Sequence, residues 1–161
     1  SGDGCRSGKP GQRPMTTIAY KAGIMAADTR AYGGFNTPLG QKRKIRRLPD
    51  GTLIGCSSNQ VGLGEAVMDW YEAGADPEKG PKADETKFTL LVVKPNGEAF
   101  YGYDSFYLSG PIRADCFAVG SGEGLAHGAM RAGASAERAV EIACDADIWS
   151  GLPVLTVSHE G

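Results

Sequence analysis

The chain has 161 residues, with 17 Lys and Arg residues against 19 Asp and Glu residues, and its formal net charge is −2. Hydrophobic residues make up 41% and charged residues 22%, which argues against wholesale disorder and suits one domain with its own core. The nearly balanced charge provides no basic surface for nucleic acid or anionic lipid, and no apolar run approaches the roughly 20 residues of a membrane helix. We therefore expect a soluble domain with no nucleic-acid or membrane partner.

The four cysteines argue against a metal site. Cys5, Cys56, Cys116 and Cys144 are far apart in the sequence, with no Cys-x-x-Cys pair and no histidine at ligand spacing. Three of them lie in apolar stretches, where a buried free thiol is the expected state. We therefore expect no metal, no cofactor and a reducing, cytoplasmic location.

Residues 1–15 differ in composition from the rest of the chain. The segment from Ser1 to Pro14 contains four glycines, two prolines and three basic residues but no apolar segment, so it lacks the core of a signal peptide. It fits a removable pro-segment, an artificial leader, or sequence upstream of a start at Met15. We expect a flexible leader over residues 1–15 and one domain over residues 16–161.

In chain order, the patterned sequence begins with predicted strands. Four strands form two hairpins, each around a Gly-bearing turn: Thr16–Tyr20 with Ile24–Arg30, and Lys44–Leu48 with Thr52–Ser57. Residues 31–41, between the hairpins, are predicted to be a Gly/Pro/Asn loop. Val61–Ala73 has helical spacing and is followed by Gly74 as a plausible C-cap.

The second half is predicted to contain strands, then two helices, then a last strand. A charged loop over residues 75–87 precedes the predicted strands Phe88–Val93, Ala99–Tyr103 and Asp115–Val119. Predicted helices over Leu125–Ala132 and Ser135–Cys144 lead to a final strand over Leu152–Val157. This order predicts an α+β fold, a four-layer αββα sandwich of two antiparallel sheets covered by helices.

Common catalytic motifs are missing from the sequence. The glycines of residues 120–124 match neither the dinucleotide fingerprint nor the Walker pattern. Val119 occupies the first glycine position of a nucleophile elbow around Ser121, no HExxH is present, and neither His127 nor His159 is placed for a triad. The chemistry therefore has to be sought elsewhere.

Four short motifs, in one order, carry a resemblance to the N-terminal-threonine hydrolases. They are the strand pair around Thr16-Thr17 and Ala26-Ala27-Asp28-Thr29-Arg30, the strand Lys44-Ile45-Arg46-Arg47-Leu48, the turn Ala118-Val119-Gly120-Ser121-Gly122, and Asp147-Ile148-Trp149-Ser150-Gly151. The chain from about Thr16 to Val157 thus resembles proteasome β-subunits and the bacterial HslV peptidase, and short phage- or prophage-type relatives look most similar. The resemblance implies the Ntn-hydrolase fold.

The resemblance also implies a catalytic set without histidine. Thr16 would be the nucleophile, and Lys44, paired with Asp28, would lie beside it. Ser121, Asp147 and Ser150 would support the same region. A threonine hydroxyl needs a base, and an N-terminal threonine can use its own α-amine, whose ordinary pKa is about 7.7–8.0. Without the resemblance, Asp28 and Lys44 would pass for an ordinary surface pair.

Substrate-binding positions follow from the same resemblance. Asn59 aligns best with the backbone N–H donor of the oxyanion hole, and Ser58 is the second choice. Ser57 and Val61 would line the primary specificity pocket, with Tyr32 at its rim.

Three functions stay open at this point. The first is a threonine peptidase acting on peptides or proteins in a homo-oligomeric ring. The ring would be a hexamer or heptamer, with stacking in a double ring and an AAA+ unfoldase as open options. The second is a non-catalytic ring or shell subunit that retains its leader. The third is an Ntn amidohydrolase acting on small molecules. The first requires that residues 1–15 be removed, by self-cleavage or by loss of an initiator Met15, so that Thr16 becomes N-terminal.

Overall fold

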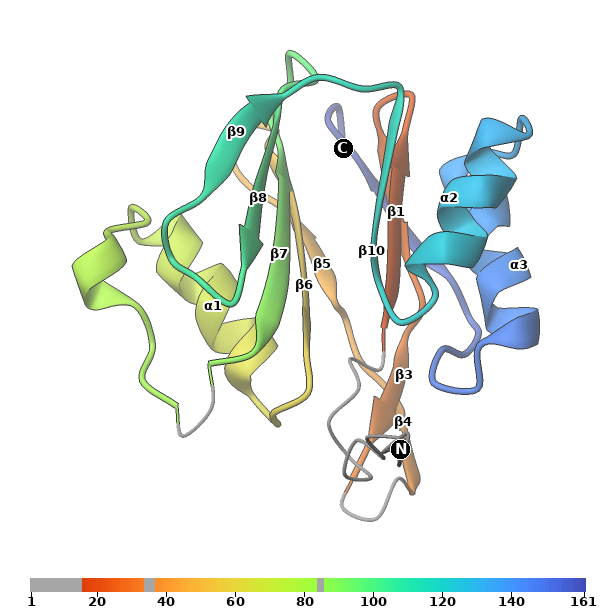
Figure 1. Ribbon diagram of the computed structural model, residues 1–161, viewed down its shortest axis with the longest axis horizontal. Helices are drawn as coiled ribbons and strands as arrows, with labels where there is room; N and C mark the ends of the chain where they lie inside the picture. Colours follow the sequence, from red (N-terminus) through yellow and green to blue (C-terminus); the bar gives the residue numbers. More distant parts are fainter. Residues whose placement is uncertain (1–15, 34–36, 84–85) are drawn as a thin grey trace, which may run out of the picture.

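The computed structural model describes residues 16–33, 37–83 and 86–161, which form two β-sheets stacked face to face between helices (Figure 1). The expected leader, residues 1–15, lies outside the described residues. The four-layer αββα sandwich predicted from the sequence is confirmed.

The first sheet holds the start of the described chain. It has four antiparallel strands in the order β10-β1-β2-β11, with bounds Cys116–Gly120, Thr17–Lys21, Ile24–Ala27 and Leu155–Ser158. β1 and β2 form the predicted hairpin. Its two turn residues, Ala22 and Gly23, have φ values of 51° and 82°, and two consecutive positive φ angles match the twist of a tight hairpin.

The second sheet has five antiparallel strands in the order β5-β6-β7-β8-β9. Their bounds are Ile45–Arg47, Leu53–Ser58, Phe88–Val93, Ala99–Tyr103 and Ser109–Ile112. The sequence predicted four of these strands and missed β9. All four residues of β9 are exposed and one is Pro111, so this edge strand has neither the apolar alternation nor the composition that marks a strand.

The prediction of a loop over residues 31–41 is wrong in part. β3 (Arg30–Tyr32) and β4 (Pro38–Gln41) pair as a small separate sheet, and residues 34–36 lie outside the described part. β4 is exposed throughout, so no apolar pattern marked it. The predicted strand to Arg30 is divided at Asp28, where the chain leaves β2.

Helices cover both outer faces of the stacked sheets. α1 (Leu63–Glu72) packs on the five-stranded sheet, and α2 (Glu123–Arg131) and α3 (Ala136–Ala146) pack on the four-stranded sheet (Figure 1). A short 3-10 turn, Pro77–Lys79, lies within the predicted charged loop. No helix in the described ranges has the length and apolar character needed to cross a membrane.

The core is layered as the strand patterns require. β7 is buried at all six positions, because it faces the other sheet on one side and α1 on the other, which is why it reads as a continuous apolar run. Leu91 packs between the sheets, and Leu90 packs beneath α1. The α2–α3 layer is built mostly from alanines, which allow these helices to lie close to β1 and β2.

Candidate active site

Asp28 is the centre of a buried hydrogen-bond network at the end of β2. Its carboxylate has no solvent exposure. Oδ1 accepts the backbone N–H of Thr17 at 3.0 Å, and Oδ2 accepts the N–H groups of Gly151 at 3.0 Å and Arg30 at 3.3 Å. One carboxylate therefore joins the start of β1 to the segment that precedes β11.

Lys44 supplies the positive charge that this carboxylate requires. Its Nζ lies 3.0 Å from each oxygen of Asp28, and the residue is 3% exposed. Burial lowers the pKa of Lys44 below its ordinary value of 10.5, and the nearby Asp28 carboxylate only partly opposes this shift. The structure thus brings together the two residues that the family resemblance paired.

Thr16 lies directly beside this ion pair. The residue is 4% exposed, and it lines one small cavity together with Lys44. Thr17 N and Lys44 Nζ are both 3.0 Å from the same Asp28 oxygen, which holds the ammonium group close to the peptide bond that follows Thr16. A buried cation next to a threonine hydroxyl stabilises an alkoxide developing there.

The turn after β10 passes against Thr16 because it carries glycine. Gly120 has φ 102°, and a Cβ placed on it would lie 1.9 Å from the Thr16 carbonyl oxygen. Gly122 makes a similarly close approach, since its Cβ would lie 2.1 Å from Thr17 Oγ1. Ser121, held between them, has its Oγ 3.3 Å from the Thr16 carbonyl oxygen.

Ser121, in the turn after β10, converges with Asp147 and Ser150, which lie in the segment after α3. Asp147 Oδ2 lies 2.5 Å from Ser121 Oγ and 2.7 Å from Ser150 Oγ. Ser150 Oγ is also 2.7 Å from Thr17 Oγ1. An ionised carboxylate only accepts hydrogen bonds, so both serines donate to Asp147, and Thr17 then donates to Ser150.

Thr17 was not selected from the sequence, yet its hydroxyl belongs to this network. Its side chain points to the helix side of the first sheet, towards Ser150 and Gly122, whereas Thr16 lines the cavity by Lys44. The opposite orientation follows from alternation along a strand. Of the two adjacent threonines, Thr16 therefore faces the cavity, and Thr17 belongs to the hydrogen-bond network with Ser150.

The cavity by Thr16 has about 20 Å³ of free volume and several walls that sequence reasoning missed. β6 contributes Cys56 and Ser58, and α1 contributes Gly64, Glu65 and Met68; Lys42, Arg43 and Lys44 complete the lining. Two sequence patterns could have indicated these residues: Cys56 and Ser58 are two apart on β6, and Gly64 and Met68 are four apart on α1, so each pair shares a face. Of the two expected oxyanion donors, Ser58 lines this cavity and Asn59 does not.

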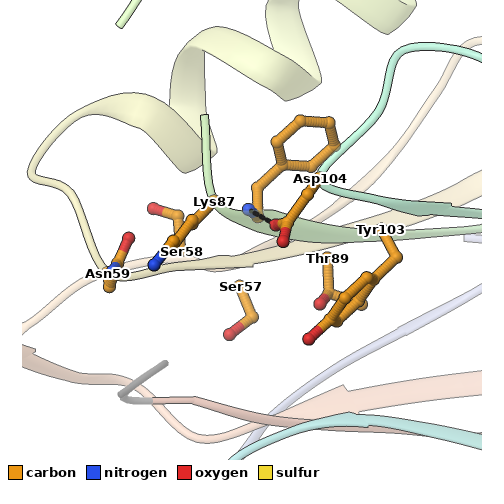
Figure 2. Close-up of a pocket in the computed structure, with 8 residues that line it drawn as sticks. Ser57, Ser58, Asn59, Lys87, Thr89, Tyr103 and Asp104 are labelled. Carbon is orange, nitrogen blue, oxygen red and sulfur yellow. Dashed lines mark hydrogen bonds between the residues drawn. The ribbon is translucent and has the colours of Figure 1, made fainter. Parts of the chain in front are cut away.

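A second cavity, of about 90 Å³, adjoins the first and is shown in Figure 2. Ser57, Thr89 and Tyr103 lie opposite one another on β6, β7 and β8, and all three line it. Ser58 borders both cavities, and Asn59 borders this one. Ser57 is 1% exposed, and its Oγ finds no hydrogen-bond partner among the described residues.

The two remaining expected pocket residues lie elsewhere. Tyr32 donates a hydrogen bond from its hydroxyl to the Ile148 carbonyl at 2.8 Å, and its ring packs edge-on against Trp149. Val61 is 87% exposed in the turn before α1. Neither residue is among those described around the two cavities.

Comparisons with known proteins bear on the fold. No model of a protein family matches the sequence, and no curated protein does. Among solved structures, HslV from Trypanosoma brucei superposes with a TM-score of 0.67 at 21% identity, over 89% of this chain and 99% of that chain. BPH from Thiobacillus denitrificans, solved in complex with epoxomicin, gives 0.62 at 20% identity, over 88% and 96% of the two chains.

A second structure of the Thiobacillus denitrificans BPH gives a TM-score of 0.60 at 20% identity, over 88% of this chain and 95% of that one. All three alignments thus cover 88–89% of this chain. The chain therefore has the fold of HslV and BPH, the Ntn-hydrolase fold that its sequence motifs indicated.

Proposed function

We propose that the chain is the subunit of a threonine peptidase in which Thr16, once N-terminal, is the nucleophile. The observation that carries the proposal is the buried Lys44–Asp28 pair beside Thr16. Burying a charged pair is costly, and replacing one with apolar residues is often neutral or stabilising, so its presence next to a hydroxyl favours a chemical role. The likeness to HslV supports the same family.

The reaction proceeds in two steps. Thr16 Oγ1 attacks the carbonyl carbon of the scissile peptide bond, and its proton passes to the α-amine of the same residue. The C–N bond then breaks, the leaving nitrogen takes that proton, and an acyl ester remains on Thr16. Water, deprotonated by the same amine, cleaves the ester and restores the hydroxyl. Lys44 stabilises the alkoxide and keeps the amine neutral by charge repulsion.

A backbone N–H beside Thr16 would stabilise the tetrahedral oxyanion. We propose Ser58 as this donor in preference to Asn59, because Ser58 lines the cavity that contains Thr16. The cluster of Ser121, Asp147 and Ser150 would orient Thr16 and relay protons near its amine. Its direct contact with Thr16 is the approach of Ser121 to the carbonyl oxygen.

The chemistry requires processing of the chain. A Thr16 nitrogen joined to Met15 is an amide and has no basic lone pair, so residues 1–15 must be removed before turnover. Self-cleavage uses the same hydroxyl on the preceding carbonyl, with Lys44 again beside it. We therefore propose a removable leader over residues 1–15 and a catalytic domain over residues 16–161.

The proposed assembly is a homo-oligomeric ring, a hexamer or heptamer that can stack in a double ring, with an AAA+ unfoldase as a possible partner. Large apolar side chains on the surface support subunit contacts: Val61, Ile148 and Leu152 are 87%, 72% and 58% exposed. A cytoplasmic location fits the free thiols of Cys56, Cys116 and Cys144.

A peptide epoxyketone tests the proposal, because this reagent needs both the hydroxyl and the amine of an N-terminal threonine. We expect an intact mass that has lost residues 1–15 and then gains one inhibitor, located on Thr16 by peptide mapping. A chain that retains Ser1 and does not react would favour the non-catalytic ring subunit. Epoxyketone reaction without hydrolysis of fluorogenic peptides would favour the small-molecule amidohydrolase.

The pH dependence of peptide hydrolysis should be bell-shaped. Activity rises with pH as the Thr16 amine, whose ordinary pKa is about 7.7–8.0, loses its proton. It falls again as Lys44 loses its charge, and because burial lowers the pKa of Lys44, this limb lies below pH 10.5. Measuring kcat/KM from pH 5 to 11 gives both limbs.

The variant Lys44→Arg tests whether deprotonation of Lys44 causes the fall in activity at high pH. Arginine keeps its charge throughout this range, so the fall at high pH should disappear even if overall activity is reduced. An alkaline limb that stays in place in this variant would belong to another group.

A further inference from the structure

Glu65 lies in the wall of the Thr16 cavity, and only one of its two carboxylate oxygens accepts a hydrogen bond among the described residues. Oε1 accepts a hydrogen bond from Lys42 Nζ at 3.0 Å. Oε2 is buried and has no hydrogen-bond partner among the described residues. A buried carboxylate oxygen without a donor is unfavourable, so this atom favours any ligand that brings an N–H group.

Glu65 is also charged at neutral pH. Burial alone would raise the pKa of Glu65, but the hydrogen bond and the positive charge of Lys42 outweigh it, and the pKa is lowered. Burial raises the pKa of the Cys56 thiol, so the facing wall stays neutral. Met68 adds apolar surface beside it.

The wall therefore places the apolar side chain of Met68 in the same small cavity as a negative carboxylate, a pairing that suits the side chains of lysine and arginine. Their methylene stems pack on apolar surface while the cationic end pairs with a carboxylate. Of the cations around the cavity, Lys44 is paired with Asp28 and Lys42 with Glu65, while Arg43 is exposed.

Lys42 lines the cavity and pairs with Glu65 in this structure. The free volume of about 20 Å³ holds about one water molecule and no long side chain. The side chain of Lys42 is 44% exposed, and exposed ion pairs contribute little to stability, so its ammonium group can leave Glu65 at little cost. A substrate cation can replace it with no net change in charge.

We propose that Glu65 selects substrates with lysine or arginine on the acyl side of the cleaved bond, the substrate's cation displacing Lys42. This inference rests on the proposed peptidase function and names its substrate class. The carboxylate contacts the substrate side chain and not the reacting atoms, so it acts as a specificity residue.

Fluorogenic peptides that differ only in the residue before the cleaved bond test this proposal. With the processed protein, we expect kcat/KM for Arg and Lys to exceed that for Leu at least about 10-fold and that for Glu by more, as expected for a charge pair of 1–3 kcal/mol. Glu65→Gln should reduce the Arg and Lys rates about 10-fold or more and leave the Leu rate within about twofold. Lys42→Met should raise the Arg and Lys rates by removing the competing cation.

Glu72→Gln is the matched control, since Glu72 lies on the same helix and pairs with Arg46, away from the cavity. It should leave all ratios unchanged. Equal rates for Arg and Leu, or faster cleavage after Glu, in the wild-type protein would overturn the specificity while leaving the peptidase function standing, whether or not the Glu65 variant folds. No cleavage of any peptide together with no epoxyketone reaction would overturn both.

Discussion

Replacing Lys44 with methionine should reduce peptide hydrolysis at least about 100-fold and destabilise the fold by about 3–5 kcal/mol. The activity falls because no charge remains beside Thr16 to stabilise the alkoxide. The stability falls because the Asp28 carboxylate, fully buried, is left without its cation. Urea unfolding and kcat/KM measured on the same preparations give the two effects.

A double variant separates these two effects. Asp28→Asn combined with Lys44→Met removes both charges and keeps one oxygen, which can accept the Thr17 N–H or the Gly151 N–H but not both. It should regain part of the lost stability without regaining activity. Lys94→Met, at a half-buried lysine over the Tyr71 ring, is the control and should change neither quantity appreciably. Full activity in the Lys44→Met protein would contradict the proposed mechanism.

In a chain produced to begin at residue 16, Thr16→Ala should lower turnover by about 10³-fold or more, since the nucleophile and the acyl ester are both lost. Thr16→Ser keeps the hydroxyl and the amine and should stay active. Hydrolysis of a fluorogenic peptide and burst amplitude measure the loss, and circular dichroism should show that the alanine variant keeps its secondary structure.

The neighbouring threonine provides the matched control for this experiment. Thr17→Ala removes the same hydroxyl one residue later, where it contacts Ser150 and not the cavity. It should cost about 1–2 kcal/mol of stability and keep measurable turnover. If Thr17→Ala abolished activity and Thr16→Ala did not, the assignment of the nucleophile would be wrong by one residue. Activity in a chain that still carries residues 1–15 would exclude the α-amine as the base.

Much of the fold could be read from the sequence because the strong signals were local. The turn residues Ala22-Gly23 and the apolar run of β7 mark their elements directly. β4 and β9 were missed because every residue in them is exposed, and they pair through backbone groups that composition does not reveal. Ser121 lies just before α2, but the helix is capped at Gly122, and the Ser121 hydroxyl turns to Asp147.

The residues of the candidate site also fall into two groups, those that the sequence indicates and those that only the structure reveals. Asp28, Lys44, Ser121, Asp147 and Ser150 could be named because they lie in short motifs, and the structure brings them together around Thr16 and Thr17. The residues of the cavity walls could not be named from the sequence. Glu65 and Met68, for example, reach the cavity from a helix whose placement depends on tertiary packing. The resemblance placed Ser57 in the primary specificity pocket. Its chain neighbours Cys56 and Ser58 line the Thr16 cavity, whereas Ser57 itself lines the adjoining cavity.

The two glycines that flank Ser121 restrict how this chain can diverge. At Gly120 and Gly122 the space of a missing methyl group is already taken, by the Thr16 carbonyl oxygen and the Thr17 hydroxyl. An exposed position can accept almost any residue at little cost, but alanine at either glycine would push the start of β1 away from its ion pair. Most surface positions of this protein can therefore change during evolution. Positions 120 and 122, in contrast, must stay glycine for as long as a threonine begins the first strand.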